Sequence, residues 1–227
     1  MVATATTLAA SMRVLRDEAA GRLTPARADQ HIARWSASLL AQVDLSFEIA
    51  QVELVPRDEA FVVMSNHQSL YDIPVLCQAV PLRMRMIAKA ELFRFPLWGR
   101  AMTNLGFIDL DRGNRAQSLQ GLKRAQSALA SGTSIWVAPE GTRSPTGRLL
   151  PFKAGGFHLA SAARARILPV TIDGTRHALP AKSLQARRGV HVRVTFGAPI
   201  DTRDFQRAQR STLIERVRAE IEQPLVQ

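Results

Sequence analysis

A histidine and an aspartate five residues apart have the chemistry of a general base and its orienting partner. They are His67 and Asp72, in the stretch SNHQSLYD that starts at Ser65. A neutral imidazole can take a proton from a substrate hydroxyl if a carboxylate holds the ring in the right tautomer. The same stretch has an ordinary alternative, in which Ser69 and Asp72 form a helix capping box and His67 is a plain loop residue. The pair by itself leaves both interpretations open.

A second set of residues has the chemistry of an anion-binding site. Arg112 follows one apolar run, and the stretch PEGTRS at 139–144 follows another. Gly141 lets the backbone turn tightly, so that Thr142 and Arg143 can come close to a phosphate. An arginine can hold phosphate oxygens through charge-assisted hydrogen bonds, each worth roughly 1.5 to 3 kcal/mol. These residues predict a site for an anionic substrate.

The elements around these residues must bring them together. The apolar run 61–64 predicts a short buried strand that ends just before His67. Two residues five apart on one α-helix point about 140° away from each other, so the pair can meet only if His67 lies in the loop before the helix. Pro74 is tolerated in a first helical turn, which places the predicted helix start near Asp72.

The rest of the chain from residue 46 alternates between strand and helix patterns. Predicted strands are 46–54, 61–64, 85–88, 107–110, 134–138, 167–172 and 190–196, and predicted helices are 73–78, 96–105, 116–131, 157–163 and 205–222. This alternation indicates an α/β fold with a mixed, partly parallel sheet flanked by helices. Because ligands bind beyond the carboxyl ends of strands in open α/β sheets, we expect the histidine and the anion-binding residues to share one edge.

The first 45 residues predict a helical segment with a break at 21–25, preceding a domain over 46–227. An apolar stripe recurs at helical spacing in its second half, at Ile32, Trp35, Leu39, Leu40 and Val43. The stripe either packs on the domain or lies in a membrane surface with Trp35 in lipid. The same two interpretations apply to a second apolar cluster, formed by Phe93, Phe95, Leu97 and Trp98.

Composition and charge restrict the classes of partner. The chain has 227 residues, 46% of them hydrophobic, and a formal net charge of +11. Residues 143–193 carry an excess of basic over acidic side chains, which favours a phosphate-bearing molecule, an anionic membrane or nucleic acid as partner. Nucleic acid is the least favoured because no helix-turn-helix or zinc-ligand pattern is present. The alternative is a solvated basic surface that binds nothing specific.

The chain also indicates where the protein works. Its one cysteine, Cys77, has no disulfide partner, which fits a reducing compartment. No apolar run approaches the 18 or so residues of a membrane-spanning helix, and no signal peptide is recognisable. We expect a cytoplasmic protein, peripheral on the cytoplasmic face of the membrane. The histidines show no metal-ligand spacing, so we expect neither a metal nor an organic cofactor.

The chain resembles the glycerolipid acyltransferase family, typified by bacterial 1-acyl-sn-glycerol-3-phosphate acyltransferase. Four ordered blocks carry the resemblance over roughly residues 45–200. They are Asn66, His67 and Asp72 in an Asn-His-x4-Asp block, Gly106 and Arg112 six residues apart, the intact stretch at 139–144, and Leu168, Pro169 and Val170. Lys89 to Leu92, between the first two blocks, is also similar to the family. One departure is Ala138, which stands where phenylalanine is common and affects packing more than chemistry.

The resemblance implies roles for these residues. An acyl thioester of coenzyme A or acyl carrier protein would be attacked by the free hydroxyl of a lysophospholipid, with His67 as the base. Arg143 and Arg112, with Gly141, Thr142 and Lys89, would hold the acceptor phosphate. Glu140 would bind a substrate hydroxyl, or else pair with a neighbouring arginine to hold the loop.

Three functions remain open at this stage. The leading one is the acylation of 1-acyl-glycerol-3-phosphate to phosphatidic acid, and a second uses another acceptor, such as a lyso-ornithine lipid or dihydroxyacetone phosphate. The third is a non-catalytic module that binds lipid phosphate. A hydrolase with Ser69 as nucleophile is disfavoured, because no Gly-x-Ser-x-Gly turn surrounds Ser69 and the arginines would have no role.

Overall fold

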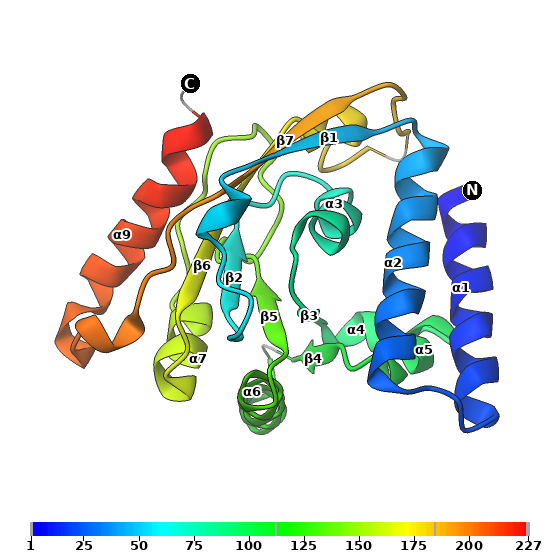
Figure 1. The fold of residues 1–227 in the computed structure, drawn as a ribbon, viewed down its shortest axis with the longest axis horizontal. Coiled ribbons are helices and arrows are strands. Elements are labelled where there is room, and N and C mark those ends of the chain that lie inside the picture. Colours follow the sequence, from blue (N-terminus) through cyan, green and yellow to red (C-terminus); the bar gives the residue numbers. More distant parts are fainter. Residues whose placement is uncertain (1, 112, 184, 226–227) are drawn as a thin grey trace.

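A seven-stranded β-sheet forms the centre of the molecule (Figure 1). A computed structural model describes residues 2–111, 113–183 and 185–225. The strands are β1 (Ser46–Ala50), β2 (Val62–Ser65), β3 (Met84–Lys89), β4 (Ile108–Leu110), β5 (Ser134–Val137), β6 (Ile167–Asp173) and β7 (His191–Phe196). Their order is β1-β7-β6-β2-β5-β3-β4, and all neighbours are parallel except β6 and β7. The predicted mixed, partly parallel sheet is confirmed.

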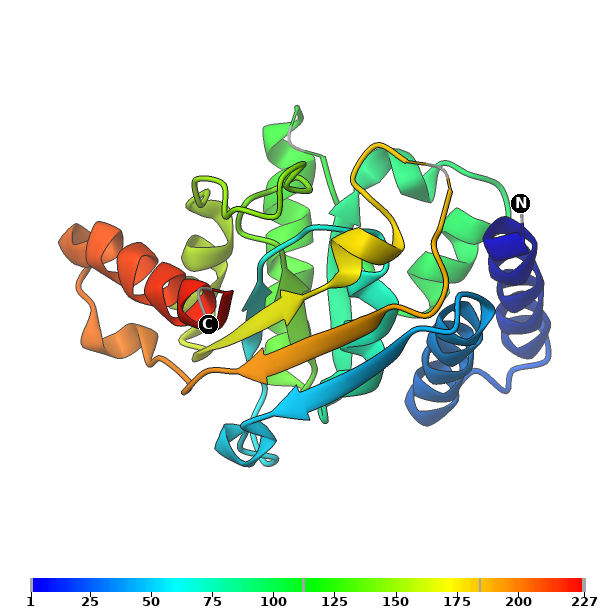
Figure 2. The same cartoon turned by 90° about the horizontal axis from the view of Figure 1, so that it is seen from above.

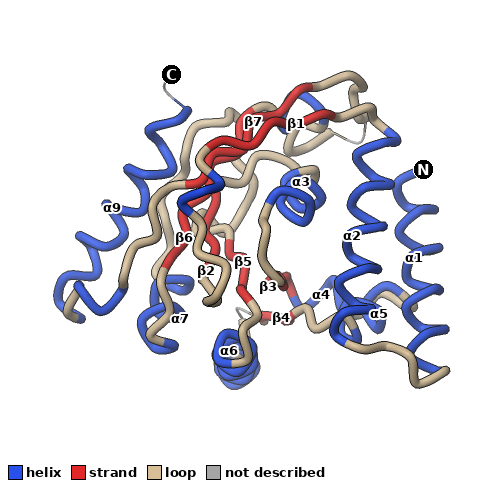
Figure 3. Tube along the Cα trace, viewed as in Figure 1, coloured by secondary structure: helices blue, strands red, loops and turns tan. Residues whose placement is uncertain are grey.

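Helices cover both faces of the sheet (Figures 2 and 3). They are α1 (Val2–Ala19), α2 (Pro25–Gln42), α3 (Asp72–Ala79), α4 (Ala90–Phe93), α5 (Trp98–Asn104), α6 (Arg115–Ala130), α7 (Gly155–Ala163), α8 (Thr175–Ala178) and α9 (Arg210–Glu222). Successive strand residues point to opposite faces. Val63 therefore joins the core under α2 and α3, whereas Val62 and Met64 join the core under α6, α7 and α9. A strand buried on both faces explains why this run is uniformly apolar.

The N-terminal segment is a pair of helices with the predicted break between them. The second helix begins where Thr24 caps it and Pro25 occupies its first turn. The side chain of Asp17 closes the turn by accepting hydrogen bonds from Arg27 at 2.9 Å and from His31 at 2.9 Å. This pair of helices is therefore tied together by buried polar contacts as well as by apolar packing.

The apolar stripe of α2 packs on the sheet domain. Ile32, Leu39, Leu40 and Val43 belong to the same buried core as the central strands. Trp35 packs against this core, and its indole N–H donates to the hydroxyl of Thr7 on α1 at 3.1 Å. The interpretation that places Trp35 in lipid is therefore not supported. None of the described helices has both the length and the hydropathy needed to cross a bilayer.

Several predicted element boundaries were wrong by a few residues. The strand expected over 46–54 ends at Ala50, since Gln51 adopts a left-handed conformation with φ of 61° and a short 3₁₀ turn follows. Leu97 is also left-handed, so the helix expected from residue 96 starts at Trp98. The last helix starts at Arg210, after 3₁₀ turns that the helical pattern at 205–222 did not predict. The four-residue helices α4 and α8 were missed.

Candidate active site

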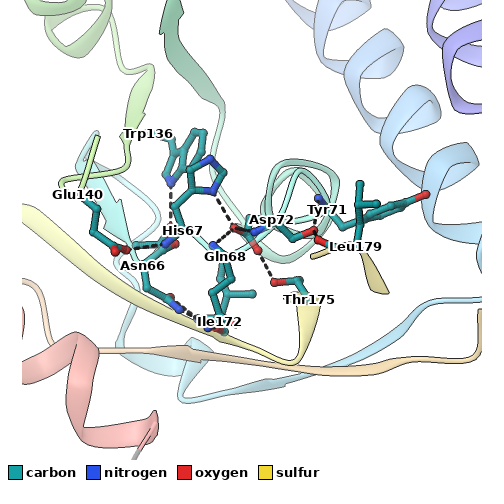
Figure 4. A network of polar contacts seen from close by, with 12 residues as sticks. Asn66, His67, Gln68, Tyr71, Asp72, Trp136, Glu140, Ile172, Thr175 and Leu179 are labelled. Carbon is teal, nitrogen blue, oxygen red and sulfur yellow. Dashed lines mark hydrogen bonds and ion pairs between the residues drawn. The ribbon is translucent and has the colours of Figure 1, made fainter. Parts of the chain in front are cut away.

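The histidine and aspartate lie in hydrogen-bond contact at the carboxyl edge of the sheet (Figure 4). His67 is in the loop after β2, and Asp72 is the first residue of α3. The Nδ1 atom of His67 lies 2.7 Å from Oδ2 of Asp72. An ionised carboxylate can only accept, so Nδ1 carries the proton and Nε2 is the basic nitrogen. The His67 side chain is 14% exposed, so a substrate can reach the ring.

Asp72 is fully buried and is held by four donors. Its Oδ2 atom accepts the backbone N–H groups of Gln68 at 2.7 Å and Ser69 at 2.9 Å, in addition to His67 Nδ1. Its Oδ1 atom accepts the hydroxyl of Thr175 from α8. A buried carboxylate is tolerated when its lone pairs are satisfied in this way. The four donors also fix the direction in which the carboxylate meets the imidazole.

Only half of the capping box that offered an ordinary explanation of this stretch forms. The Asp72 carboxylate accepts the N–H of Ser69 at 2.9 Å, but the N–H of Asp72 donates to the carbonyl of Ser69 at 3.3 Å and not to its hydroxyl. The residue preceding α3 is Tyr71, whose side chain makes no capping hydrogen bond. The Ser69 hydroxyl instead donates to the carbonyl of Leu179 at 2.8 Å and accepts the N–H of Tyr71 at 3.1 Å. Ser69 is therefore a buried structural residue with its hydroxyl fully engaged.

Asn66 locks the loop to the neighbouring strand. Its side-chain amide donates to the carbonyl of Ile172 at 2.8 Å and accepts the N–H of the same residue at 2.8 Å. This pair of bonds continues the parallel pairing of β2 with β6 beyond Ser65. The chain therefore leaves β2 in a fixed direction, and His67 follows at a defined place.

Glu140 holds the backbone on the other side of the histidine. Its Oε1 atom accepts the N–H of His67 at 2.8 Å, and its Oε2 atom accepts the N–H of Leu150 at 2.8 Å. The side chain is buried, and this burial raises the pKa of the Glu140 carboxyl, although the two backbone hydrogen bonds act in the opposite direction. No ion pair between Glu140 and an arginine occurs in the described part of the chain. This geometry fits a positioning residue better than either role expected from the sequence.

The loop 140–144 lies directly against the histidine. The N–H of Ser144 donates to the carbonyl of His67 at 2.7 Å, which brings the chain at Arg143 close to the loop of His67. Gly141 has a positive φ of 73°, in keeping with the tight turn expected there. The partly buried Arg143 has no ion pair with any described residue, and Thr142 is exposed. An unpaired arginine beside a base is suited to an anionic substrate.

Lys89, another predicted anion-binding residue, lies on the β3 side of the same edge. Lys89 is exposed at the end of β3, and Asp111 follows β4. These strands are parallel to β2 and β5, so their carboxyl ends face the same way. Arg112 lies outside the described residues.

Three residues at this site were not predicted from the sequence. Thr175 reaches Asp72 from a connection after β6, where Gly174 turns the chain with φ of 102°. Trp136 packs edge-on against His67, with ring centroids 5.6 Å apart. Gln68 donates from its side chain to the carbonyl of Ile172 at 2.9 Å. Trp136 lies in a predicted strand and Gln68 follows the histidine, but Thr175 has no sequence signal of its own.

Comparison with known proteins agrees with this geometry. The family model described as Acyltransferase matches residues 46–173. A 1-acyl-sn-glycerol-3-phosphate acyltransferase from Cocos nucifera is 33% identical over 159 residues, which are 70% of this chain and 51% of that protein. The corresponding protein of Saccharomyces cerevisiae is 30% identical over 198 residues, covering 83% of this chain and 65% of its own length. The chain thus spans about half the length of the first of these relatives.

A solved structure shares the fold over nearly the whole chain. It is the crystal structure of the 1-acyl-sn-glycerophosphate acyltransferase PlsC from Thermotoga maritima, with a TM-score of 0.75 and 24% sequence identity. The match covers 98% of this chain and 95% of the other. At this identity the likeness establishes the fold.

Proposed function

This chain belongs to the acyltransferase family, and on that premise we propose that it transfers a fatty acyl group from an acyl thioester to the free hydroxyl of 1-acyl-glycerol-3-phosphate, giving phosphatidic acid. The observation that carries the proposal is the contact between His67 and Asp72, with the unpaired Arg143 beside it. The pair supplies a base, and the arginine supplies a contact for a phosphate. The relatives' activity on 1-acyl-glycerol-3-phosphate agrees with both features.

The proposed reaction is a direct transfer. His67 Nε2 takes the proton of the acceptor hydroxyl while the oxygen of that hydroxyl bonds to the thioester carbonyl carbon. The carbon–sulfur bond of the resulting tetrahedral intermediate then breaks, and the leaving thiolate takes the proton back from the imidazolium. Asp72 stabilises the imidazolium throughout, because its carboxylate lies 2.7 Å from Nδ1. A Ser69 acyl-enzyme does not fit, since that hydroxyl is buried and engaged.

In this proposal the anion-binding residues orient the acceptor. Arg143, with Thr142 and Gly141 of the same turn, holds the phosphate, and Lys89 and Arg112 contribute from the neighbouring strand ends. Fixing the phosphate converts binding energy into orientation of the hydroxyl toward His67. Glu140 acts on the backbone of His67 and not on the substrate.

The test is a panel of acceptors with one acyl-CoA and one acyl carrier protein donor. Purified protein is incubated with each donor and with 1-acyl-glycerol-3-phosphate, a lyso-ornithine lipid or dihydroxyacetone phosphate, and free thiol is measured. We expect 1-acyl-glycerol-3-phosphate to stimulate thiol release most strongly. If only another acceptor stimulates thiol release, that molecule and not 1-acyl-glycerol-3-phosphate is the acceptor. If no acceptor stimulates release, the proposed acyl transfer is refuted.

We also propose that the protein is peripheral on the cytoplasmic face of a membrane, where its lipid acceptor resides. Exposed apolar side chains occur on α1, at Leu8 and Met12, and before α5, at Phe95 and Leu97. The two elements are joined by an ion pair between Arg100 and Glu18 at 3.0 Å. Apolar side chains next to basic ones suit an anionic lipid surface.

This attachment can be measured by sedimentation with liposomes. Anionic liposomes should carry the protein down, and high salt should release part of it, because charges separated by more than about 8 Å are screened at physiological ionic strength. Replacing Phe95 and Leu97 by aspartate should weaken sedimentation strongly. Leu119→Asp on α6, which removes an equally exposed apolar side chain, is the control and should sediment normally. Equal loss in both variants would refute this docking surface.

A further inference from the structure

A cavity of about 510 Å³ lies beside the candidate active site. Its lining holds none of the residues that are proposed to bind the acceptor phosphate. Its lining includes Gln68, Arg148, Arg176 and Arg218, together with Asp173 and Glu222. Ligand pockets commonly enclose about 300 to 1,000 Å³, so the space is large enough for a small organic molecule. Gln68 is the neighbour of His67 in the chain, so the cavity lies against the loop that carries the proposed base.

The cavity lies on the β6 side of the pair β2 and β5, whereas Lys89 lies on the β3 side. The cavity residues come from the end of β6, from the connections after β2, β5 and β6, and from α9, whereas Lys89 is the last residue of β3. In the sheet order, β6 and β3 flank the pair β2 and β5. A transferase of the proposed kind has two anionic substrates, an acceptor phosphate and the phosphate-bearing carrier of the acyl group. The fold thus offers a separate region for each.

Two arginines of the cavity, Arg148 and Arg176, have N–H groups that are free to bind an anion. The backbone of Arg148 is fixed, since its carbonyl accepts the hydroxyl of Ser144 at 2.7 Å, while its exposed side chain has no partner among the described residues. Arg176 donates from Nη1 to the carbonyl of Thr146 at 2.8 Å and has no ion pair within the described ranges. A side chain on Gly147 would come within 2.7 Å of that Nη1 atom, so this glycine allows the close approach. A guanidinium has five N–H donors, which leaves several of those on Arg176 available.

The third arginine, Arg218, makes structural contacts, one of them with the acid Glu222. The other acid, Asp173, makes no contact with these arginines among the described residues. Arg218 donates to the carbonyls of Leu150 at 2.9 Å and Leu149 at 3.2 Å, and it lies 3.4 Å from Glu222. This arginine therefore fixes the loop to α9. Asp173 is exposed at the end of β6. With three arginines and two acids, the lining has a net charge of +1. The N–H groups available to a ligand belong to Arg148 and Arg176, which have no ion pair among the described residues.

Gln68 provides a second sign that a ligand belongs here. Gln68 as a residue is 1% exposed, and its Oε1 atom has no hydrogen-bond partner in the described part of the chain. Turning the amide over would not help, because Oε1 would then face the carbonyl of Ile172, which can only accept. A buried acceptor without a donor is costly, so a molecule with an N–H or O–H group would stabilise this position.

We propose that this cavity binds the phosphopantetheine arm of the acyl donor, an inference that rests on the proposed acyl transfer. The phosphate of the arm meets Arg148 and Arg176, an amide N–H or the hydroxyl of the arm donates to Gln68 Oε1, and the thioester at the end of the arm lies toward His67. This arm is the chemistry that coenzyme A and acyl carrier protein share. The site accordingly recognises the carrier, whereas Arg143 recognises the acceptor.

Direct binding tests the site without requiring catalysis. Titration calorimetry with coenzyme A, 4′-phosphopantetheine, pantetheine and a phosphopantetheine-loaded acyl carrier protein is performed on wild-type protein and on Arg148→Gln, Arg148→Lys and Arg164→Gln. The Arg148→Gln variant should bind the phosphate-bearing ligands roughly tenfold more weakly, the low end for a charge-assisted hydrogen bond because Arg148 is exposed. Its affinity for pantetheine should not change, and lysine should restore part of the loss. Whichever of coenzyme A and the carrier protein binds more tightly is the natural source of the arm.

Arg164 is the matched control, since it is an exposed arginine after α7 at the opposite edge of the sheet. Arg164→Gln should bind all ligands as the wild type does. Equal binding of coenzyme A by wild type and Arg148→Gln, or an equal loss in Arg164→Gln, would overturn the site. If coenzyme A is bound through Arg148 but no acceptor is acylated, the site stands and the proposed transfer fails. If acylation occurs and Arg148→Gln has an unchanged KM for acyl-CoA, the transfer stands and this site fails.

Discussion

Replacing Asp72 by asparagine should separate the charge of the carboxylate from its role in holding the loop. Two backbone N–H groups, those of Gln68 and Ser69, donate to the oxygen that also meets His67. These donors should keep the amide oxygen of an asparagine in the same place and direct its NH₂ group toward the Thr175 hydroxyl. His67 therefore keeps its tautomer, and the substitution removes only the negative charge.

The expected loss follows from the Coulomb energy of the pair. In the transition state the imidazolium faces a buried carboxylate whose oxygen lies 2.7 Å from Nδ1. Two unit charges about 4 Å apart interact by about 4 kcal/mol at an effective dielectric constant of 20. Since each 1.36 kcal/mol changes a rate about tenfold, Asp72→Asn should lower kcat by about 10³.

The assay is the initial rate of thiol release from acyl-CoA that depends on 1-acyl-glycerol-3-phosphate. The KM for both substrates should be nearly unchanged, because neither contacts Asp72. Thermal unfolding of the variant gives the control, and we expect a change of only a few degrees. A variant that is folded and retains more than a tenth of the wild-type kcat would show that the carboxylate charge contributes little to the transition state.

Three further substitutions test the surrounding contacts. Thr175→Val removes a neutral donor to the charged Asp72 at constant volume and should lower kcat roughly tenfold or more with unchanged KM, whereas Thr175→Ser should restore the rate. Burial raises the pKa of Glu140, so the folded protein loses stability as pH rises above the ordinary glutamate range. Urea unfolding should therefore show the free energy of unfolding of the wild type falling relative to that of Glu140→Gln as pH rises. A difference that does not change with pH would contradict this. The pKa of the Asp17 carboxyl lies well below its usual range, and the largest cause is the hydrogen bond from the Arg27 guanidinium. The stability advantage of wild type over Asp17→Asn should therefore be full above about pH 5 and shrink as pH falls, and an advantage that persists at low pH would argue against this contact.

The fold followed from the sequence because its signals are local. Apolar runs such as 61–64 and 167–172 are buried on both faces in the structure, and the alternation with helices indicates the sheet class. The strand order and the reversed direction of β7 depend on contacts between distant segments and could not be read from periodicity. The boundaries at Gln51 and Leu97 depend on left-handed backbone conformations of residues that rarely adopt them.

The candidate site was predictable where it is continuous in the chain. The position of Pro74 and the geometry of a helix were enough to place His67 in the loop and Asp72 at the start of α3, and the structure confirms this contact. The contribution of Thr175 could not be predicted, because the residue is 103 positions from Asp72 and reaches it only through the pairing of β2 with β6. The catalytic and binding roles of these residues stay predictions.

Glu140 shows a different limit of reasoning from the sequence. A glutamate in a stretch with an arginine predicts an ion pair or a substrate contact. In the fold both of its oxygens accept backbone N–H groups, because the loop after β5 and the loop after β2 close on each other there. Backbone donors cannot be recognised from the types of the residues that carry them, so this role appears only with coordinates.

We propose that His67 acts as the base in acyl transfer to a lysophospholipid. The most direct measurement compares wild-type protein with His67→Ala in the rate of thiol release that depends on 1-acyl-glycerol-3-phosphate. General base catalysis typically contributes about 10² to 10⁴ in rate, and we predict a loss of this size with the fold intact. A His67→Ala variant that transfers the acyl group at the wild-type rate would exclude His67 as the base.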